Sequence, residues 1–392
     1  MTLVAETDQS IARYESFVKM DPHNAQLWVA LGDLYHKVKR LDEALASFER
    51  ASQEAPDMPS AKSRIASVLI TQHRFADAET VLRDLLRAEP DSPALHFNLA
   101  LSQYYQRKWT DAFDNFSGAL ARGMRSNETY AYLARTLHFL GRMREALEFC
   151  NQWVVQAGDS ASSGYRALLE MDEGNMARAV ELAREVLERD PTNTDAAVVT
   201  GTHAVENQEM LEAERAFEDV LKREPDNGRA WLGLGMVRMY HQKHADAIGA
   251  LEKAIEYMPD SSGTIVALGW AHLVNRDLAA SERAFRHAVD VDRGFAEAHG
   301  GLASAFALQV KVDAAEQSIA VANRLDRNNF GAQFARSVIL KIQGRGETAQ
   351  RIIAGLLERA PAPDAKSLIE QIRLYGAKQL KAGAVPNSKH SA

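Results

Sequence analysis

The stretch "LWVALGDLYHKVKRLDEALASFERASQEAPD", Leu27 to Asp57, decides the fold of this chain. Its apolar residues recur at helical spacing in two runs, with a polar break between the runs and a proline near the end. Gly32 and Ala44 are small, which suits the close crossing of two helices. Pro56 is expected to end the second helix, because proline lacks a backbone donor and clashes with the preceding turn. The stretch therefore predicts two helices packed as a hairpin.

This hairpin pattern recurs along the chain with a period of 34 residues. Equally spaced prolines show the period: Pro22, Pro56 and Pro90, and then Pro191, Pro225 and Pro259. The interval from 90 to 191 is 101, one residue short of three periods, so the chain has one slip near 158–160. The units start at residues 25, 59, 93, 127, 160, 194, 228, 262, 296 and 330. Position 20 of each unit is then small: Ala44, Ala78, Ala112, Ala146, Ala179, Ala213, Ala247, Ser281, Ala315 and Ala349.

The residues within one period match a known family pattern. The pattern W-x2-L-G-x2-Y, then A-x3-F, then P, is met in full by Trp28, Leu31, Gly32, Tyr35, Ala44, Phe48, Ala51 and Pro56. The sequence resembles the tetratricopeptide-repeat family over residues 25–363. This resemblance implies an all-α, right-handed α-solenoid of about ten tetratricopeptide repeats, whose first helices line a concave groove.

Both flanks of the array are predicted to cover its ends. Residues 1–24 are expected to form an N-terminal capping helix with the apolar residues Ile11, Tyr14, Phe17 and Val18; a homodimer formed through the terminal helices is the alternative. Residues 364–380 are expected to form a C-terminal capping helix, and residues 381–392 a disordered tail. Around the slip, residues 158–170 have low helix propensity, which predicts thin packing and a soft point in the array.

Composition limits the classes of function. Hydrophobic residues make up 46% and charged residues 25% of the chain, as in a folded soluble protein. The formal net charge of -7 argues against nucleic-acid binding, which usually needs a basic face. No apolar run is long enough for membrane insertion, no signal peptide is visible, and Cys150 is the only cysteine. These features predict a cytoplasmic protein.

The sequence predicts that the chain is not an enzyme and binds no cofactor or metal. It contains no metalloprotease, P-loop, serine-hydrolase or kinase signature. His241 and His244 are three residues apart, but they bracket a turn and have no third ligand nearby in the sequence. Cys150 falls at a core position of its repeat and is expected to be a buried structural thiol.

The family resemblance implies that positions 2, 5, 9, 12 and 13 of each repeat line the groove. No repeat has Lys at position 5 or Asn at position 9, so the carboxylate clamp of chaperone-binding family members is not expected. Apolar residues cluster at these positions in the third, seventh and eighth repeats, and clustered apolar groups in a concavity favour binding. The predicted partner-binding residues are Phe97, Leu101, Tyr104, Tyr105, Arg135, His138, Leu232, Met236, Met239, Tyr240, Trp270 and Leu273.

The leading functional hypothesis is a non-enzymatic scaffold that binds a protein or peptide segment in its groove through these apolar anchors. One alternative is a chaperone-like carrier of secretion or envelope-assembly clients. Another is an accessory subunit of an enzyme held in another chain. Within the third repeat the adjacent Tyr104 and Tyr105 take positions 12 and 13, so both are expected to be partly exposed, with Trp109 packing beside them.

Overall fold

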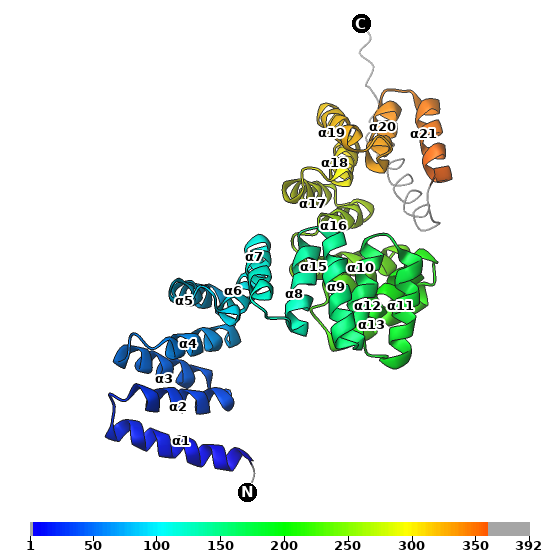
Figure 1. The fold of residues 1–392 in the computed structure, drawn as a ribbon. Coiled ribbons are helices and arrows are strands. Elements are labelled where there is room, and N and C mark those ends of the chain that lie inside the picture. The colour runs from blue at the N-terminus through cyan, green and yellow to red at the C-terminus, as the bar shows by residue number, and fades with distance from the viewer. Residues whose placement is uncertain (1–2, 360–392) are drawn as a thin grey trace. The chain divides into compact units, whose positions relative to one another are not determined.

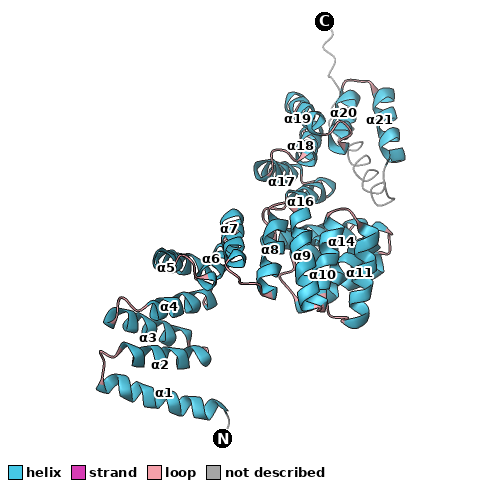
Figure 2. Cartoon of the chain, in the orientation of Figure 1, coloured by secondary structure: helices cyan, strands magenta, loops and turns pink. Residues whose placement is uncertain are grey.

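The computed structural model describes residues 3–359, which contain 21 helices and no strand (Figures 1 and 2). The expected all-α class is therefore confirmed. The chain divides into two compact units, Met1–Gly174 and Asn175–Ala392. The boundary falls in the turn of the fifth helix pair.

After α1 the helices follow one another as ten pairs, and each pair corresponds to one period of the sequence (Figure 1). The first compact unit contains α1 (Leu3–Met20), α2 (Ala25–Lys37), α3 (Leu41–Glu54), α4 (Pro59–Thr71), α5 (Phe75–Ala88), α6 (Pro93–Tyr105), α7 (Trp109–Ala121), α8 (Asn127–Phe139), α9 (Met143–Ala157) and α10 (Ser160–Asp172). The second contains α11 (Met176–Arg189), α12 (Thr194–Glu206), α13 (Met210–Arg223), α14 (Gly228–Tyr240), α15 (His244–Tyr257), α16 (Ser262–Val274), α17 (Leu278–Val291), α18 (Ala296–Leu308), α19 (Val312–Leu325), α20 (Phe330–Ile342) and α21 (Gly346–Arg359). The even-numbered helices from α2 to α20 begin at the ten unit starts given by the period.

The turn between the two helices of a pair always contains one residue with left-handed backbone. It stands at repeat position 15: Lys39, His73, Arg107, Gly141, Gly174, Gln208, Gln242, Arg276, Val310 and Gly344. Glycine adopts this backbone freely, whereas a β-branched residue such as Val310, with φ of 62°, is strained there. The turn geometry is thus a property of the repeat and is kept even where the residue does not favour it.

Ring side chains at repeat position 4 fasten the first helix to the turn before it. The indole N–H of Trp28 donates to the carbonyl of Pro22 at 2.8 Å, and that of Trp231 donates to Pro225 at 2.8 Å. In two further repeats a histidine ring nitrogen lies 3.0 Å from the carbonyl oxygen six residues earlier, in His96 and His299. Each contact joins the first helix to a carbonyl of the loop that precedes it.

Helix α1 covers the apolar face of the first pair. Ile11 and Val18 are buried in one cluster with Leu31 and Tyr35. The hydroxyl of Tyr35 donates to a carboxylate oxygen of Glu15 at 2.6 Å, which ties α2 to α1. The role of α1 as a cap stays a prediction, and the predicted C-terminal capping helix and tail, 364–380 and 381–392, lie outside the described residues.

The soft point expected at residues 158–170 stays a prediction, although the helix that forms there, α10, is capped and has a buried face. Asp159 caps α10, because its side chain accepts a hydrogen bond from the backbone N–H of Ser162 at 2.8 Å. The buried residues of α10 are Ser162, Gly164, Tyr165, Ala167, Leu168 and Leu169. Burial of Tyr165, Leu168 and Leu169 on one side of the helix offsets the weak intrinsic helix propensity of this segment. Cys150 on α9 is fully buried, with its sulfur 3.8 Å from the carbonyl oxygen of Ser162, as predicted for a structural thiol.

Two first helices of the second compact unit, α18 and α20, approach until their backbones touch. A Cβ atom added at Gly331 would overlap the backbone of Gly300, so only glycine allows this contact. The hydroxyl of Ser304 donates to the carbonyl of Gly331 at 2.9 Å across the same contact. The first helices at this point therefore pack against each other and leave no open groove between them.

Candidate partner-binding surfaces

Aromatic side chains from α5, α6, α7 and α8 gather in the first compact unit. We call the following set the aromatic cluster: Phe75, Phe97, Tyr104, Tyr105, Trp109, Phe116, Tyr132 and Phe139. Tyr105 stacks on Phe75, with ring centroids 4.7 Å apart and planes inclined by 12°. Phe139 stacks on Trp109 in the same way at 4.3 Å and 12°, one repeat further along. Repeat position 13 thus carries a ring that rests on position 17 of the preceding repeat.

The interior of the cluster is formed around Tyr104. Its ring makes edge contacts with four others, at centroid distances of 5.5 Å to Tyr105, 5.3 Å to Trp109, 5.1 Å to Tyr132 and 6.1 Å to Phe139. Burial raises the pKa of the Tyr104 phenol to about 12, because the charged form would lose its hydration. Tyr104 is therefore a packing residue that holds the other rings in place.

Two rings of the cluster remain open at the surface: Tyr105 is 50% exposed and Phe139 is 57% exposed. We call this pair the aromatic surface. Of the other predicted residues in the third repeat, Phe97 and Leu101 are half-buried and pack against the cluster. The predicted set of partner-binding residues lacks Phe139. Phe139 stands at position 13 of the fourth repeat, one of the groove-lining positions, so the sequence contained the signal that identifies this residue.

Arg135 and His138, predicted as polar groove residues, hold α8 against α10. The Arg135 guanidinium carbon lies 5.1 Å from the ring centroids of both Trp153 and Tyr165, as in cation–π contacts. One ring nitrogen of His138 lies 2.9 Å from the hydroxyl of Tyr165, and the other lies 2.8 Å from a carboxylate oxygen of Asp172. Both side chains are thus engaged within the first compact unit.

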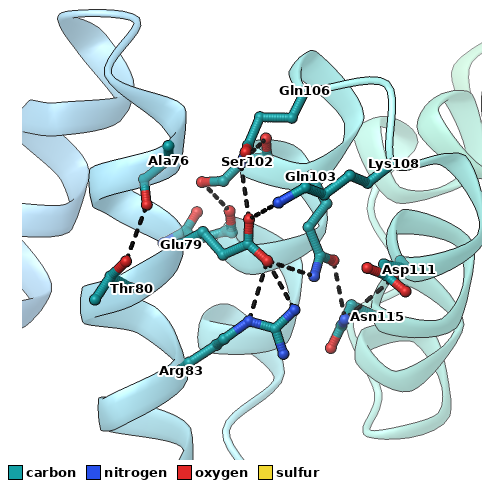
Figure 3. A network of polar contacts seen from close by, with 11 residues as sticks. Ala76, Glu79, Thr80, Arg83, Ser102, Gln103, Gln106, Lys108, Asp111 and Asn115 are labelled. Atoms are coloured by element: carbon teal, nitrogen blue, oxygen red, sulfur yellow. Dashed lines mark hydrogen bonds and ion pairs between the residues drawn. The ribbon is translucent and has the colours of Figure 1, made fainter.

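A buried carboxylate anchors α6 to α5 beside the aromatic surface (Figure 3). Glu79 is only 6% exposed, and it accepts hydrogen bonds from Lys108 at 2.7 Å, Arg83 at 2.7 Å and Gln106 at 2.9 Å. Burial alone would raise the pKa of this carboxyl, but the donors, with Lys108 foremost, hold the pKa at about 2. Gln106 follows Tyr105 directly, so the network fixes the end of α6 that presents the exposed ring.

The same network recurs in the second compact unit. Glu282 accepts from Arg286 at 2.9 Å, from Gln309 at 3.0 Å and from Lys311 at 2.9 Å. Burial opposes ionisation here too, but the donors lower the pKa of Glu282. Each of the four residues lies 203 positions after its counterpart, as in 282 − 79 and 311 − 108. Six periods less the one-residue slip give this offset, so the two compact units contain equivalent segments.

The second predicted group of residues, in the seventh and eighth repeats, is less open than expected. Met236 is 39% exposed, while Leu232, Met239 and Tyr240 are half-buried. The prediction for Leu273 is wrong, because its side chain is 0% exposed and lies within the core.

Trp270, from the same predicted group, is half-buried inside the second compact unit. Its ring lies 5.3 Å from Phe285 and 5.5 Å from Phe330 on α20, two repeats further along. The contact with Phe330 arises because α18, which lies between α16 and α20 in sequence, is built largely from Ala and Gly. Trp270 therefore joins two first helices.

Metal ligation and membrane crossing find no support in the described part of the chain. No group of three His, Cys, Asp or Glu side chains within it is arranged to hold a metal ion. No helix in this part combines the length and the apolarity that crossing a membrane requires.

Two family models match the sequence. The first, described as the tetratricopeptide-repeat domain of cytochrome c-type biogenesis protein H, matches residues 17–130. The second, described as tetratricopeptide repeat, matches residues 99–162, 198–261 and 266–330. A curated relative, the cytochrome c-type biogenesis protein CycH of Rhizobium meliloti (strain 1021), is 29% identical over 109 residues. The match covers 27% of this chain and 29% of that protein, so it spans less than a third of the relative's length.

Solved structures agree on the fold. The match to the APC/C hetero-tetramer Cut9-Hcn1 covers 75% of this chain and 59% of the matched chain, with a TM-score of 0.51 and 14% identity. The match to a monomeric mutant of IFIT1 with Gppp-AAAA covers 91% of this chain and 90% of the matched chain, with a TM-score of 0.55 and 15% identity. At such low identity these similarities concern the architecture alone.

Proposed function

We propose that this chain, which belongs to the tetratricopeptide-repeat family of protein-interaction scaffolds, binds a partner polypeptide segment. The contact is made through its aromatic surface. The observation that carries the proposal is the exposure of Tyr105 and Phe139, at 50% and 57%, on a rigid base of stacked rings. Each ring is already held by stacking, so a partner that covers it orders few additional degrees of freedom. Covering one such ring contributes about 1.5–3 kcal/mol.

A second contact belongs to the same proposal. Met236 on α14 is exposed beside the half-buried Leu232 and Tyr240, and flexible thioether side chains adapt to partners of varying sequence. This patch lacks stacked rings, and only one of its three side chains is exposed. We therefore assign it a supporting role and place the main anchors at Tyr105 and Phe139.

A more specific candidate function is a part in cytochrome c-type biogenesis. The supporting observations are the match of residues 17–130 to the biogenesis family model and the 29% identity to CycH. Phe75, Tyr105 and Trp109 lie inside the matched range, whereas Phe139 lies beyond it. In this reading the chain acts as a carrier that shields an assembly client, or as an accessory subunit for an enzyme in another chain.

Affinity capture with mass spectrometry tests the proposal. The full chain is compared with a Tyr105→Ala/Phe139→Ala double variant and with Val155→Ala as control, since Val155 is an exposed apolar residue on α9 outside the aromatic cluster. We expect the double variant to lose partners that the wild type and the control retain, with at least tenfold lower recovery. Retention of every partner by the double variant would overturn the proposal.

Three measurements on the purified chain separate the readings. Suppression of client aggregation favours the carrier, whereas co-purification of an activity absent from this chain alone favours the accessory subunit. Turnover by this chain alone would contradict the non-enzymatic scaffold. Cell fractionation tests the predicted cytoplasmic location, and light scattering tests the homodimer alternative for the terminal helices.

A further inference from the structure

A pocket of about 360 Å³ lies between α19, α20 and α21 in the second compact unit. Ile319 and Asn323 of α19 and Ile352 of α21 form part of its lining. Arg327, from the loop before α20, and Arg336 of α20 also line it. This volume is within the usual range for small-molecule sites. The pocket combines an apolar floor with two cationic side chains.

The sequence of the tenth repeat explains why the pocket is open. Repeat position 7 carries a Leu or Ile side chain in seven repeats: Leu31, Ile65, Leu99, Leu133, Leu234, Leu268 and Leu302. In the tenth repeat this position is Arg336, whose longer polar side chain is exposed. Position 4, filled by an indole in Trp28 and Trp231, is here the smaller Gln333. The tenth repeat thus lacks the branched apolar side chain at position 7 and has no indole at position 4.

The two arginines have no counter-ion in the described part of the chain. Arg327 and Arg336 form neither an ion pair nor a hydrogen bond with any residue there. The fifth repeat also has an arginine at position 7, but Arg166 lies 3.9 Å from the carboxylate of Glu170, four residues later. The residue four positions after Arg336 is Leu340. The tenth repeat thus brings two guanidinium groups to one pocket without supplying an acid.

We propose that this pocket binds an oxyanion, a carboxylate or phosphate group, carried on a short apolar stem. Guanidinium groups offer paired N–H donors that match the oxygen spacing of carboxylate and phosphate. Asn323 supplies an amide donor, while Ile319 and Ile352 contact the stem. The pocket lies at the N-terminal end of α20, where the helix dipole also favours negative charge. The site is separate from the aromatic surface and independent of the proposed function.

Calorimetric titration of the full chain tests the site with four probes: hexanoate, hexyl phosphate, inorganic phosphate and hexylamine. We expect hexanoate or hexyl phosphate to bind and hexylamine to show no binding. The tighter-binding of the two anions identifies the preferred headgroup. If inorganic phosphate binds as tightly as hexyl phosphate, the apolar stem contributes nothing and the site takes a free ion. Absence of binding by all three anions would overturn the proposal.

Variants locate the binding. Gln333→Trp introduces the residue of the first and seventh repeats and fills the pocket, whereas Arg336→Leu restores the commonest residue at position 7. Each of these two variants should weaken anion binding at least tenfold. Arg327→Gln should have the same effect, and because Arg327 is an exposed loop residue this change leaves the repeat core unaltered. Arg324→Leu, at an exposed arginine outside the pocket lining, should leave affinity within twofold. Affinity unchanged in all three pocket variants would refute the site.

Discussion

Phe139 lies flat on Trp109, with ring centroids 4.3 Å apart and ring planes inclined by 12°, and still leaves 57% of its surface exposed. One face of the ring is thus used for support and the other remains available. Tyr105 has the same relationship to Phe75 one repeat earlier. Side chains of this kind are fixed before a partner arrives, which is the property expected of binding anchors.

Stability measurements should separate the packing ring from the exposed ring. Tyr104→Ala removes a ring that touches four others, so we expect a loss of about 3 kcal/mol in unfolding free energy. Phe139→Ala removes a ring supported on one face only and should cost about 1 kcal/mol. Urea unfolding followed by circular dichroism measures both. Equal losses would contradict the division between packing and exposed rings.

The Glu79 network predicts a pH-dependent stability. The pKa of Glu79 is about 2 in the folded chain and ordinarily 4.5, so the ionised carboxylate stabilises the fold above pH 4.5. This contribution is lost as the pH falls from 4.5 through 2. Glu79→Gln should therefore lower stability at pH 7 by on the order of 3 kcal/mol, and the difference from wild type should shrink toward pH 2.

A control on the same helix sharpens this test. Asp77 on α5 forms an exposed ion pair with Arg74, the residue before the helix, so Asp77→Asn should leave stability close to that of the wild type. Thermal or urea unfolding at pH 7, 5, 4 and 3 gives the comparison. A difference between Glu79→Gln and wild type that stays constant across these pH values would argue against the depressed pKa.

The left-handed turn predicts a stabilising substitution. Val310 has φ of 62°, in a region that costs an L-residue about 1–2 kcal/mol, while the equivalent Gly141 and Gly344 adopt it freely. Val310→Gly should raise the unfolding free energy by about 0.5–1 kcal/mol, because relief of strain exceeds the added chain entropy of glycine. Gly141→Val should have the opposite sign, since nothing lies within 4 Å of a Cβ added there and only the backbone strain remains. Denaturant unfolding of both variants measures the two signs.

The contact between Trp270 and Phe330 predicts an energetic coupling across two repeats. Their ring centroids are 5.5 Å apart, and aromatic pairs at such distances contribute about 0.5–1.5 kcal/mol beyond burial. A double-mutant cycle of Trp270→Leu and Phe330→Leu should give a coupling energy in that range. A cycle of Trp270 with Met236, which does not share this contact, serves as the reference. Additive effects in the first cycle would show that the two helices are held by other contacts.

The repeat period could be derived from the sequence because it depends on local requirements. A small residue at position 20, exemplified by Ala44, is needed wherever two helices cross, and Pro56 can only stand where a helix ends. These requirements act within about 34 residues. Helix starts and the all-α class therefore follow from the pattern, without knowledge of how distant repeats pack.

Exposure at the candidate sites could not be derived in the same way. Leu273 and Trp270 occupy groove-lining positions, yet they are covered because α16, α18 and α20 lie close together. That closeness depends on Gly300 and Gly331, which belong to other repeats. Position in the repeat predicts which way a side chain points, whereas the residues of neighbouring repeats decide whether anything reaches it.

The offset of 203 residues shows what side-chain size does on a common scaffold. The position of Phe97 in the first compact unit corresponds to Gly300 in the second, and that of Tyr104 corresponds to Ala307. Where rings stand, they act as spacers between consecutive first helices and leave Tyr105 and Phe139 exposed. Where Gly and Ala stand, the first helices pack directly against each other and cover this face. A few substitutions on one helix face would thus be enough to convert a repeat with exposed rings into one whose face is closed by its neighbour.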